Sequence, residues 1–226
     1  MKPYLVLIVL LAAPLAVFAQ HPHNSKHQHG DANAYMHQSS IDELIARFDS
    51  PDRAAWQKPE AVIALMGNLA GKTVVDIGAG SGYFAFRLAK TPARVVAADV
   101  DEGFLAHLQA QQAALKLPAE RFEVRKIPYE SPGLAQGEAD VVLLVNTYHH
   151  IHNRVAYFKQ VLAGLKGGGR LMIVDYRKEE TPQGPTMKHR ISQQKVIDEL
   201  KQAGFTSFEA NTKLLPNQYI IFAGQQ

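Results

Sequence analysis

The chain has 226 residues, of which 46% are hydrophobic and 20% are charged, and its formal net charge at neutral pH is +3. This composition is ordinary for a globular protein, and the length suits one α/β domain with extensions rather than two large domains. Lysine and arginine are spread along the chain without a cluster, so we expect no nucleic-acid partner. The absence of cysteine excludes disulfide bonds within the chain.

Residues 1–19 have the pattern of a secretory signal peptide. One positive charge, at Lys2, precedes an apolar run, and the small residues Val17 and Ala19 fit the rule for cleavage. We therefore predict cleavage after Ala19 and a periplasmic or secreted protein. A retained anchor is the alternative. Because the apolar run is short for a transmembrane helix, we expect no stable membrane span after the leader is removed.

Residues 20–38 are polar and show no apolar periodicity, which predicts a disordered linker. They contain five histidines: His21, His23, His27, His29 and His37. Two interpretations stay open, a solvated spacer and weak binding of copper, nickel or zinc by the imidazoles. The irregular spacing favours the spacer, and we predict no metal site.

Two helices are predicted between residues 39 and 70. Ser40 caps the first, whose apolar residues recur at helical spacing up to Phe48. Pro59 begins the second, which we expect to end at Gly71. Trp56, between them, either lines a ligand pocket or anchors a helix to the sheet.

The most informative stretch is VVDIGAGSGYF, residues 74–84. It begins as a buried β-branched strand and continues into a turn with glycine at alternate positions. Such a turn tolerates positive φ and lets a ligand approach the main chain. Ser81 is the predicted cap of the following helix. Tyr83 stands where a dinucleotide fingerprint requires its third glycine, which disfavours a pyrophosphate ligand.

This GxGxG pattern preceded by Asp76 resembles motif I of the class I S-adenosylmethionine-dependent methyltransferases. The next predicted strand, RVVAADVD, ends at Asp99, where the resemblance implies an acidic residue that accepts both ribose hydroxyls. The implied cofactor is S-adenosyl-L-methionine, and residues 39–70 are implied to fold over it as part of a lid. The alternative is an α/β turn that uses glycine only for close helix packing.

The resemblance implies nine cofactor-binding residues: Asp76, Gly78, Ala79, Gly80, Gly82, Asp99, Val100, Ile127 and Asn146. After the third predicted strand, residues 122–127, the family usually places an acidic or amide residue that touches the adenine amino group. Ile127 and its neighbours depart from that pattern. This departure leaves apolar packing by Ile127 or a main-chain amide as the adenine contact.

Residues 139–151, ADVVLLVNTYHHI, resemble motif IV, whose residues border the methyl group and the acceptor. An apolar strand delivers Asn146, Tyr148, His149 and His150 to the sheet edge where ligands bind in open α/β sheets. His149 and His150 are candidate general bases, because imidazole accepts a proton near neutral pH. Each is equally well interpreted as a structural histidine. Tyr148 is predicted to orient the acceptor.

The rest of the chain continues the α/β alternation. We predict a helix over 154–166, a strand over 170–176, a loop over 178–189, a helix over 192–203 and a terminal pair of strands. Asp175 either reaches the acceptor side or pairs with Arg177, and His189 and Arg190 are candidates for holding an anionic substrate. The segment LKGGGRLMIVDY also resembles the family's entry into its fifth strand. The fold class implied is a Rossmann-like three-layer α/β sandwich with a mostly parallel seven-stranded sheet whose last strand is antiparallel.

These observations predict an exported methyltransferase domain, residues 39–226, that methylates a small-molecule acceptor. Two alternatives remain because S-adenosylmethionine is made in the cytoplasm. One is a non-catalytic protein that binds S-adenosylmethionine or S-adenosylhomocysteine, and the other is an exported metal-handling protein that uses the His-rich segment.

Overall fold

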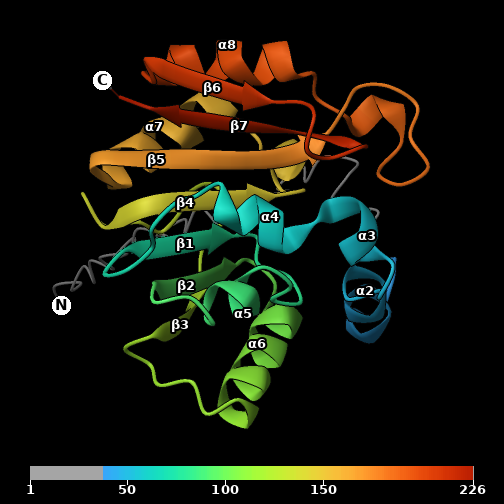
Figure 1. Ribbon diagram of the computed structural model, residues 1–226, viewed down its shortest axis with the longest axis vertical. Helices are drawn as coiled ribbons and strands as arrows, with labels where there is room; N and C mark the ends of the chain where they lie inside the picture. The colour runs from blue at the N-terminus through green and yellow to red at the C-terminus, as the bar shows by residue number, and fades with distance from the viewer. Residues whose placement is uncertain (1–37, 226) are drawn as a thin grey trace, which may run out of the picture.

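A computed structural model describes residues 38–225 (Figure 1). The predicted signal peptide, and the predicted linker as far as His37, lie outside the described residues. Within residues 38–225, no helix has both the length and the apolar character needed to cross a membrane.

A seven-stranded sheet forms the centre of the fold, with the strand order β3-β2-β1-β4-β5-β7-β6. Its strands are β1 (Thr73–Ile77), β2 (Arg94–Asp99), β3 (Phe122–Lys126), β4 (Ala139–Val145), β5 (Leu165–Tyr176), β6 (Ser207–Asn211) and β7 (Gln218–Gly224). The first five in this order pair in parallel, whereas β7 runs antiparallel to both of its neighbours. The predicted Rossmann-like fold with an antiparallel last strand is therefore confirmed.

Helices cover both faces of this sheet (Figure 1). On one face lie α4 (Pro59–Ala64), α5 (Ala85–Leu88) and α6 (Glu102–Ala114), and on the other lie α7 (Arg154–Gly164) and α8 (Gln193–Ala203). Neighbouring residues of β1 divide between the two apolar cores, because successive side chains of a strand point to opposite faces. Val74 packs with the first group of helices and Val75 with the second. The predicted three-layer sandwich is confirmed.

Two further helices, α2 (Ile41–Phe48) and α3 (Arg53–Gln57), lie beside the carboxyl ends of the parallel strands, at the right of Figure 1. The predicted cap of α2 is confirmed. The Ser40 hydroxyl accepts from the Glu43 amide, and the Glu43 carboxylate accepts from the Ser40 amide. Two 3₁₀ turns, η1 (Tyr148–His150) and η2 (Met187–His189), also lie in loops that follow strands.

Three predicted helix boundaries were wrong. Helix α4 ends at Ala64 rather than Gly71, because the chain leaves it through Gly67 at φ 78°. Helix α7 ends at Gly164, because the next residue, Leu165, already pairs with Ala139. Helix α5 begins at Ala85, so Ser81 does not cap it.

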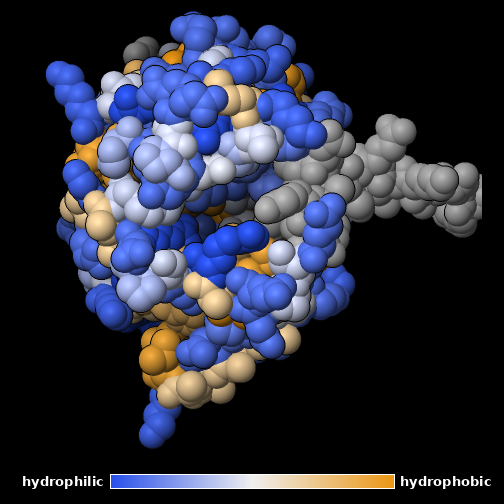
Figure 2. All heavy atoms as spheres, turned by 90° about the vertical axis from the view of Figure 1, so that its right-hand side faces the viewer, coloured by the Kyte–Doolittle hydropathy of each residue, from blue (hydrophilic) through white to orange (hydrophobic). Residues whose placement is uncertain are grey.

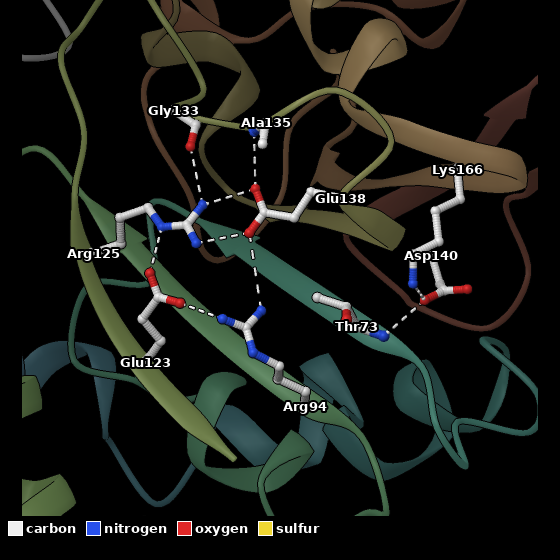
Figure 3. Close-up of polar contacts among 9 residues, drawn as sticks. All are labelled: Thr73, Arg94, Glu123, Arg125, Gly133, Ala135, Glu138, Asp140 and Lys166. Carbon is white, nitrogen blue, oxygen red and sulfur yellow. Dashed lines mark hydrogen bonds and ion pairs between the residues drawn. The ribbon is translucent and has the colours of Figure 1, made fainter. Parts of the chain in front are cut away.

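The crossover between β3 and β4 contains no helix and is held by ion pairs instead (Figure 3). The Arg125 guanidinium donates to both Glu138 carboxylate oxygens, at 2.7 and 3.0 Å, and to the Glu123 carboxylate at 2.7 Å. Arg94 binds the other side of Glu123. The guanidinium of Arg125 also donates to the Gly133 carbonyl at 3.0 Å, so the network fixes the crossover to β2 and β3.

We predict that Glu138→Gln lowers the free energy of unfolding by about 1 to 3 kcal/mol at neutral pH, measured by urea denaturation, because it leaves a half-buried guanidinium underpaired. The Arg125 hydrogen bond holds the pKa of Glu138 below its usual value. The stability from this group is therefore present above the unfolded-state pKa and is lost as the pH falls through the lower folded-state pKa. The difference in stability between the variant and the wild type should therefore shrink as the pH falls below the ordinary pKa of glutamate.

The control is Glu102→Gln, which removes an exposed ion pair between Glu102 and Lys126. The Glu102 side chain is 72% exposed and the Lys126 side chain is 62% exposed. Exposed pairs contribute little, so this variant should change stability by less than about 0.5 kcal/mol. Equal losses in both variants would contradict a structural role for the half-buried network.

Candidate active site

A large cavity lies at the carboxyl edge of the parallel strands. Its volume is about 1580 Å³, and its walls come from α2 and α3, from the loops after β1, β2, β3 and β4, and from residues 183–189. Figure 2 views the molecule from this edge and shows the hollow, with hydrophilic and hydrophobic side chains around it. Small-molecule sites have volumes of roughly 300 to 1,000 Å³. The cavity therefore has room for a nucleoside-sized ligand and a second molecule.

The glycine-rich turn after β1 forms the floor. Gly78, Gly80 and Gly82 all have positive φ, at 74°, 55° and 82°. A Cβ on Gly78 would lie 2.5 Å from the Thr147 side chain, and one on Gly82 would collide with Phe86. These two glycines are therefore required for close packing within the protein, and Gly82 brings α5 against the turn.

Three main-chain amides of this turn already have partners within the protein. The amides of Gly78 and Ala79 donate to the Ala98 carbonyl at 2.8 and 3.1 Å, and the amide of Gly80 donates to the Asp99 carboxylate at 2.8 Å. These three amides therefore hold the turn against β2.

Asp99 is the central acceptor of the site. Its carboxylate accepts from three backbone amides, of Gly80 at 2.8 Å, Val100 at 2.7 Å and Asp101 at 3.0 Å. Burial raises the pKa of Asp99, and these amide hydrogen bonds oppose that shift. A carboxylate has about four acceptor positions, so one remains for a hydroxyl donor from the cavity, whereas the resemblance implied that Asp99 accepts two.

Asp76, at the end of β1, lies deeper in the cavity wall and is only 2% exposed. Burial and the nearby charge of Asp99 raise the pKa of Asp76 to about 7, whereas Arg53 opposes the increase. The site therefore contains a second carboxyl group whose ionisation responds to a positive charge.

Apolar side chains cover the region beyond Asp99. Val100, Phe104 and Ile127 line the cavity there, together with Pro128 and Tyr129. The Ile127 amide already donates to the Asp99 carbonyl at 2.9 Å. Of the two adenine contacts left open by the sequence, apolar packing by Ile127 is the one that this geometry supports.

Asn146 follows β4 in the left-handed region, at φ 58°, and lines the cavity. Its side-chain oxygen accepts from the Gln218 amide at 2.5 Å, and the Gln218 oxygen accepts from the Gln57 amide at 3.0 Å. This buried chain of amides connects the end of β4 through β7 to helix α3.

The prediction that Tyr148 orients an acceptor is corrected. Tyr148 is fully buried and is not among the residues that line the cavity. Its hydroxyl donates to Glu199 of α8 at 2.6 Å, and its ring stacks on Phe158. The residue anchors η1 to the helical layer, a role that its aromatic type alone did not reveal.

His149 forms a dyad with Asp175, the penultimate residue of β5. The His149 Nδ1 atom lies 3.0 Å from both carboxylate oxygens, and the two side chains are 4% and 1% exposed. An ionised carboxylate only accepts, so Nδ1 carries the hydrogen and Nε2 is the basic nitrogen. Asp175 therefore pairs with His149 and not with Arg177, because η1 folds back over the end of β5.

His150 also lines the cavity, and its ring lies 4.3 Å from that of His149. Burial and the adjacent His149 lower the pKa of His150 to about 3. Its imidazole is therefore neutral and a weak base at neutral pH, which favours His149 as the proton acceptor.

The prediction that Arg190 holds an anionic substrate is corrected as well. Arg190 is 4% exposed and its guanidinium binds the carbonyls of the loop before it, at Pro185, Glu179 and Gln183. It therefore fixes the loop that forms one wall of the cavity. His189 does line the cavity, as does Trp56, whose ring packs on Tyr176.

The described residues fit S-adenosylmethionine. Asp99 supplies a free acceptor for ribose, and the apolar wall suits an adenine ring. Asp76 and Arg53 provide opposite charges for the amino-acid end. Of the predicted cofactor residues, all except Gly82 line the cavity. Among residues 38–225, no cluster of three or more histidine or acidic side chains is arranged to hold a metal ion.

Comparisons with known proteins agree with this geometry. Residues 75–173 match a family model described as "Methyltransferase domain". The chain is 32% identical to a ubiquinone biosynthesis O-methyltransferase of Acinetobacter baumannii over 127 aligned residues. The alignment covers 55% of this chain and 50% of that protein. It is 23% identical over 197 residues to a probable S-adenosylmethionine-dependent methyltransferase of Mycobacterium tuberculosis, covering 81% and 69%. The chain thus spans about half the length of the ubiquinone enzymes that it matches.

Solved structures show the same fold. A SAM-dependent methyltransferase from Aquifex aeolicus has a TM-score of 0.74 at 24% identity, covering 82% of this chain and 98% of that one. Phosphoethanolamine N-methyltransferase 2 of Haemonchus contortus, in complex with S-adenosyl-L-methionine, has a TM-score of 0.62 at 15% identity, covering 83% and 60%. At these identities the likeness concerns the fold.

We predict that Asp76→Asn stabilises the ligand-free protein at pH 8. The folded-state pKa of Asp76, about 7, lies above its ordinary value. Its stabilising contribution is therefore complete at low pH and is lost as the pH rises through about 7. Thermal unfolding should show the variant more stable by more than about 1 kcal/mol at pH 8 and little changed at about pH 4. An equal gain at both pH values would show that ionisation is not the cause.

Proposed function

We propose that this protein uses S-adenosyl-L-methionine to transfer a methyl group to a hydroxyl of a small-molecule acceptor, since residues 75–173 match a family model described as "Methyltransferase domain". The observation that carries the proposal is the His149–Asp175 dyad in the wall of the cavity that also contains Asp99. A base is useful to methyl transfer when the acceptor must lose a proton, as a hydroxyl does. The similarity to O-methyltransferases of ubiquinone biosynthesis supports the same acceptor class.

Positioning supplies most of the rate enhancement in this proposal. When bound, the cofactor supplies an activated methyl group on a sulfonium. Asp99 holds the ribose, and the apolar residues Val100 and Ile127 enclose the adenine. The cavity walls formed by α2, α3 and residues 183–189 exclude water and hold the acceptor in line.

His149 then acts as the general base. A bound cofactor would supply the methyl group to the acceptor oxygen and keep the bonding electrons on its sulfur, and the acceptor proton would pass to Nε2 of His149. Asp175 fixes the tautomer through Nδ1 and stabilises the imidazolium that results. Among the described residues, Nε2 makes no hydrogen bond.

We also propose that the protein is exported, with cleavage after Ala19. The support is the pattern of residues 1–19, a charged start, an apolar centre and small residues before the cleavage point. Amino-terminal sequencing of the protein from fractionated cells tests this part, and an intact leader in the cytoplasmic fraction would contradict it.

The cofactor assignment is tested by calorimetric titration of the chain from Gln20 onward with S-adenosylmethionine, S-adenosylhomocysteine and NAD. We expect micromolar binding of the two sulfur ligands and none of NAD. Asp99→Ala should make the binding free energy of both sulfur ligands less favourable by about 1 to 3 kcal/mol, the range for hydrogen bonds to a charged group. Unchanged affinity would remove Asp99 from the site, and no binding to the wild type would make the glycine turn purely structural.

The base assignment is tested with the acceptor that turns over best in a panel of hydroxylated small molecules. We expect His149→Ala to lower kcat by about 10²-fold or more while cofactor affinity changes less than about twofold. Asp175→Asn should lower kcat in the same direction, because it no longer stabilises the charged imidazole. His107→Ala, on α6 outside the cavity lining, is the control and should leave kcat unchanged. Wild-type turnover in His149→Ala would return that residue to a structural role, and cofactor binding without turnover on any acceptor would indicate a non-catalytic binder.

A further inference from the structure

One wall of the cavity holds an arginine without an acidic partner. Arg53 of α3 donates from Nη1 to the Phe48 carbonyl at 2.7 Å and from Nε to the Gln57 side chain. No carboxylate of the described residues lies within ion-pair distance of it, although it lines the cavity. Burial lowers the pKa of Arg53 to about 10, so it stays charged at neutral pH. A half-buried cation without a carboxylate partner favours the binding of an anion.

The neighbouring Tyr83 has a buried hydroxyl without a hydrogen-bond partner among the described residues. It is 7% exposed and lines the cavity. Its hydroxyl is the one buried side-chain polar atom in residues 38–225 without a hydrogen-bond partner. The Arg53 guanidinium lies 3.9 Å from the centre of its ring. Burial raises the pKa of Tyr83, so the hydroxyl keeps its proton and is available as a donor. A buried donor left unpaired is costly, and this one lies beside an unpaired cation.

The position of Arg53 is fixed before any ligand arrives. Gln57, which accepts from its Nε, is fully buried and donates to Gln218, which in turn donates to Asn146. This chain of amides joins α3 to the end of β4. The guanidinium is therefore held at the cavity wall at little further entropic cost on binding.

A carboxyl group of opposite charge lies nearby. Asp76 is within electrostatic range of Arg53, and both line the cavity at the end of the glycine turn. An amino acid zwitterion has the matching pair of charges, an ammonium for Asp76 and a carboxylate for Arg53. The proximity of Tyr83, which follows the last glycine of the turn, places this pair on the cofactor side rather than beside the histidines.

We propose that Arg53 and the Tyr83 hydroxyl together bind the carboxylate at the amino-acid end of the cofactor. The inference rests on the proposed function and assigns a binding role to α3, the helix that the sequence placed in a lid. It also explains why a tyrosine occupies the position at which a dinucleotide site would require glycine.

The test compares two ligands by calorimetry: S-adenosylhomocysteine, which carries the amino-acid end, and 5′-methylthioadenosine, which lacks it. We expect Arg53→Gln to lower the affinity for S-adenosylhomocysteine by about 10- to 100-fold. Tyr83→Phe should lower the same affinity by about 3- to 10-fold. Both variants should bind 5′-methylthioadenosine as the wild type does, which also shows that they are folded.

The matched control is Arg87→Gln. Its guanidinium lies 3.8 Å from the Tyr83 ring centre but is outside the cavity lining, so both ligands should bind as in the wild type. Equal weakening of both ligands by Arg53→Gln, or none, would overturn the proposal. Wild-type cofactor affinity in Arg53→Gln, together with a raised KM for a carboxylated acceptor, would assign the arginine to the acceptor instead. If the wild type binds neither ligand, the proposed function itself fails.

Discussion

The site depends on one carboxylate. Asp99 ends β2 and accepts three backbone amides, one from the glycine turn after β1 and two from its own chain beyond the strand. These bonds close the turn against the neighbouring strand and leave a single acceptor position facing the cavity. The same group thus sets the shape of the floor and is one of the carboxyl groups that line the cavity.

A second set of contacts links the helices before the sheet to the end of β4. Ser81 of the turn donates to Asp49 after α2 at 2.7 Å, while the chain from Asn146 through Gln218 and Gln57 reaches Arg53. Buried amide chains of this kind are stable only when every member is paired. Arg53 and the carboxyl end of β4 are therefore connected by a continuous chain of side-chain hydrogen bonds.

Much of the fold followed from the sequence because its signals are local. Alternating strands and helices, the glycine turn and the Ser40 capping box all depend on neighbouring residues, whereas the antiparallel last strand was implied by the resemblance to the methyltransferase family. Helix ends were less predictable, since α7 stops where Leu165 pairs with Ala139, a residue distant in sequence. Tyr148 and Arg190 were misassigned for a similar reason. Their partners, Glu199 and the carbonyls of residues 179–185, are visible only once the chain is folded.

The sequence by itself determined the class of fold, the position of the glycine turn and the acidic residue at the end of the next strand, because each is set by spacing along the chain. Only the tertiary structure decided which histidine is oriented and which arginine lacks a carboxylate. Asp175 of β5 contacts His149 in the turn that follows the neighbouring strand β4, and Arg53 of α3 contacts Tyr83 after the glycine turn. Contacts between distant segments form only when the chain packs. The sequence pattern therefore does not predict which polar groups lack partners in the folded protein.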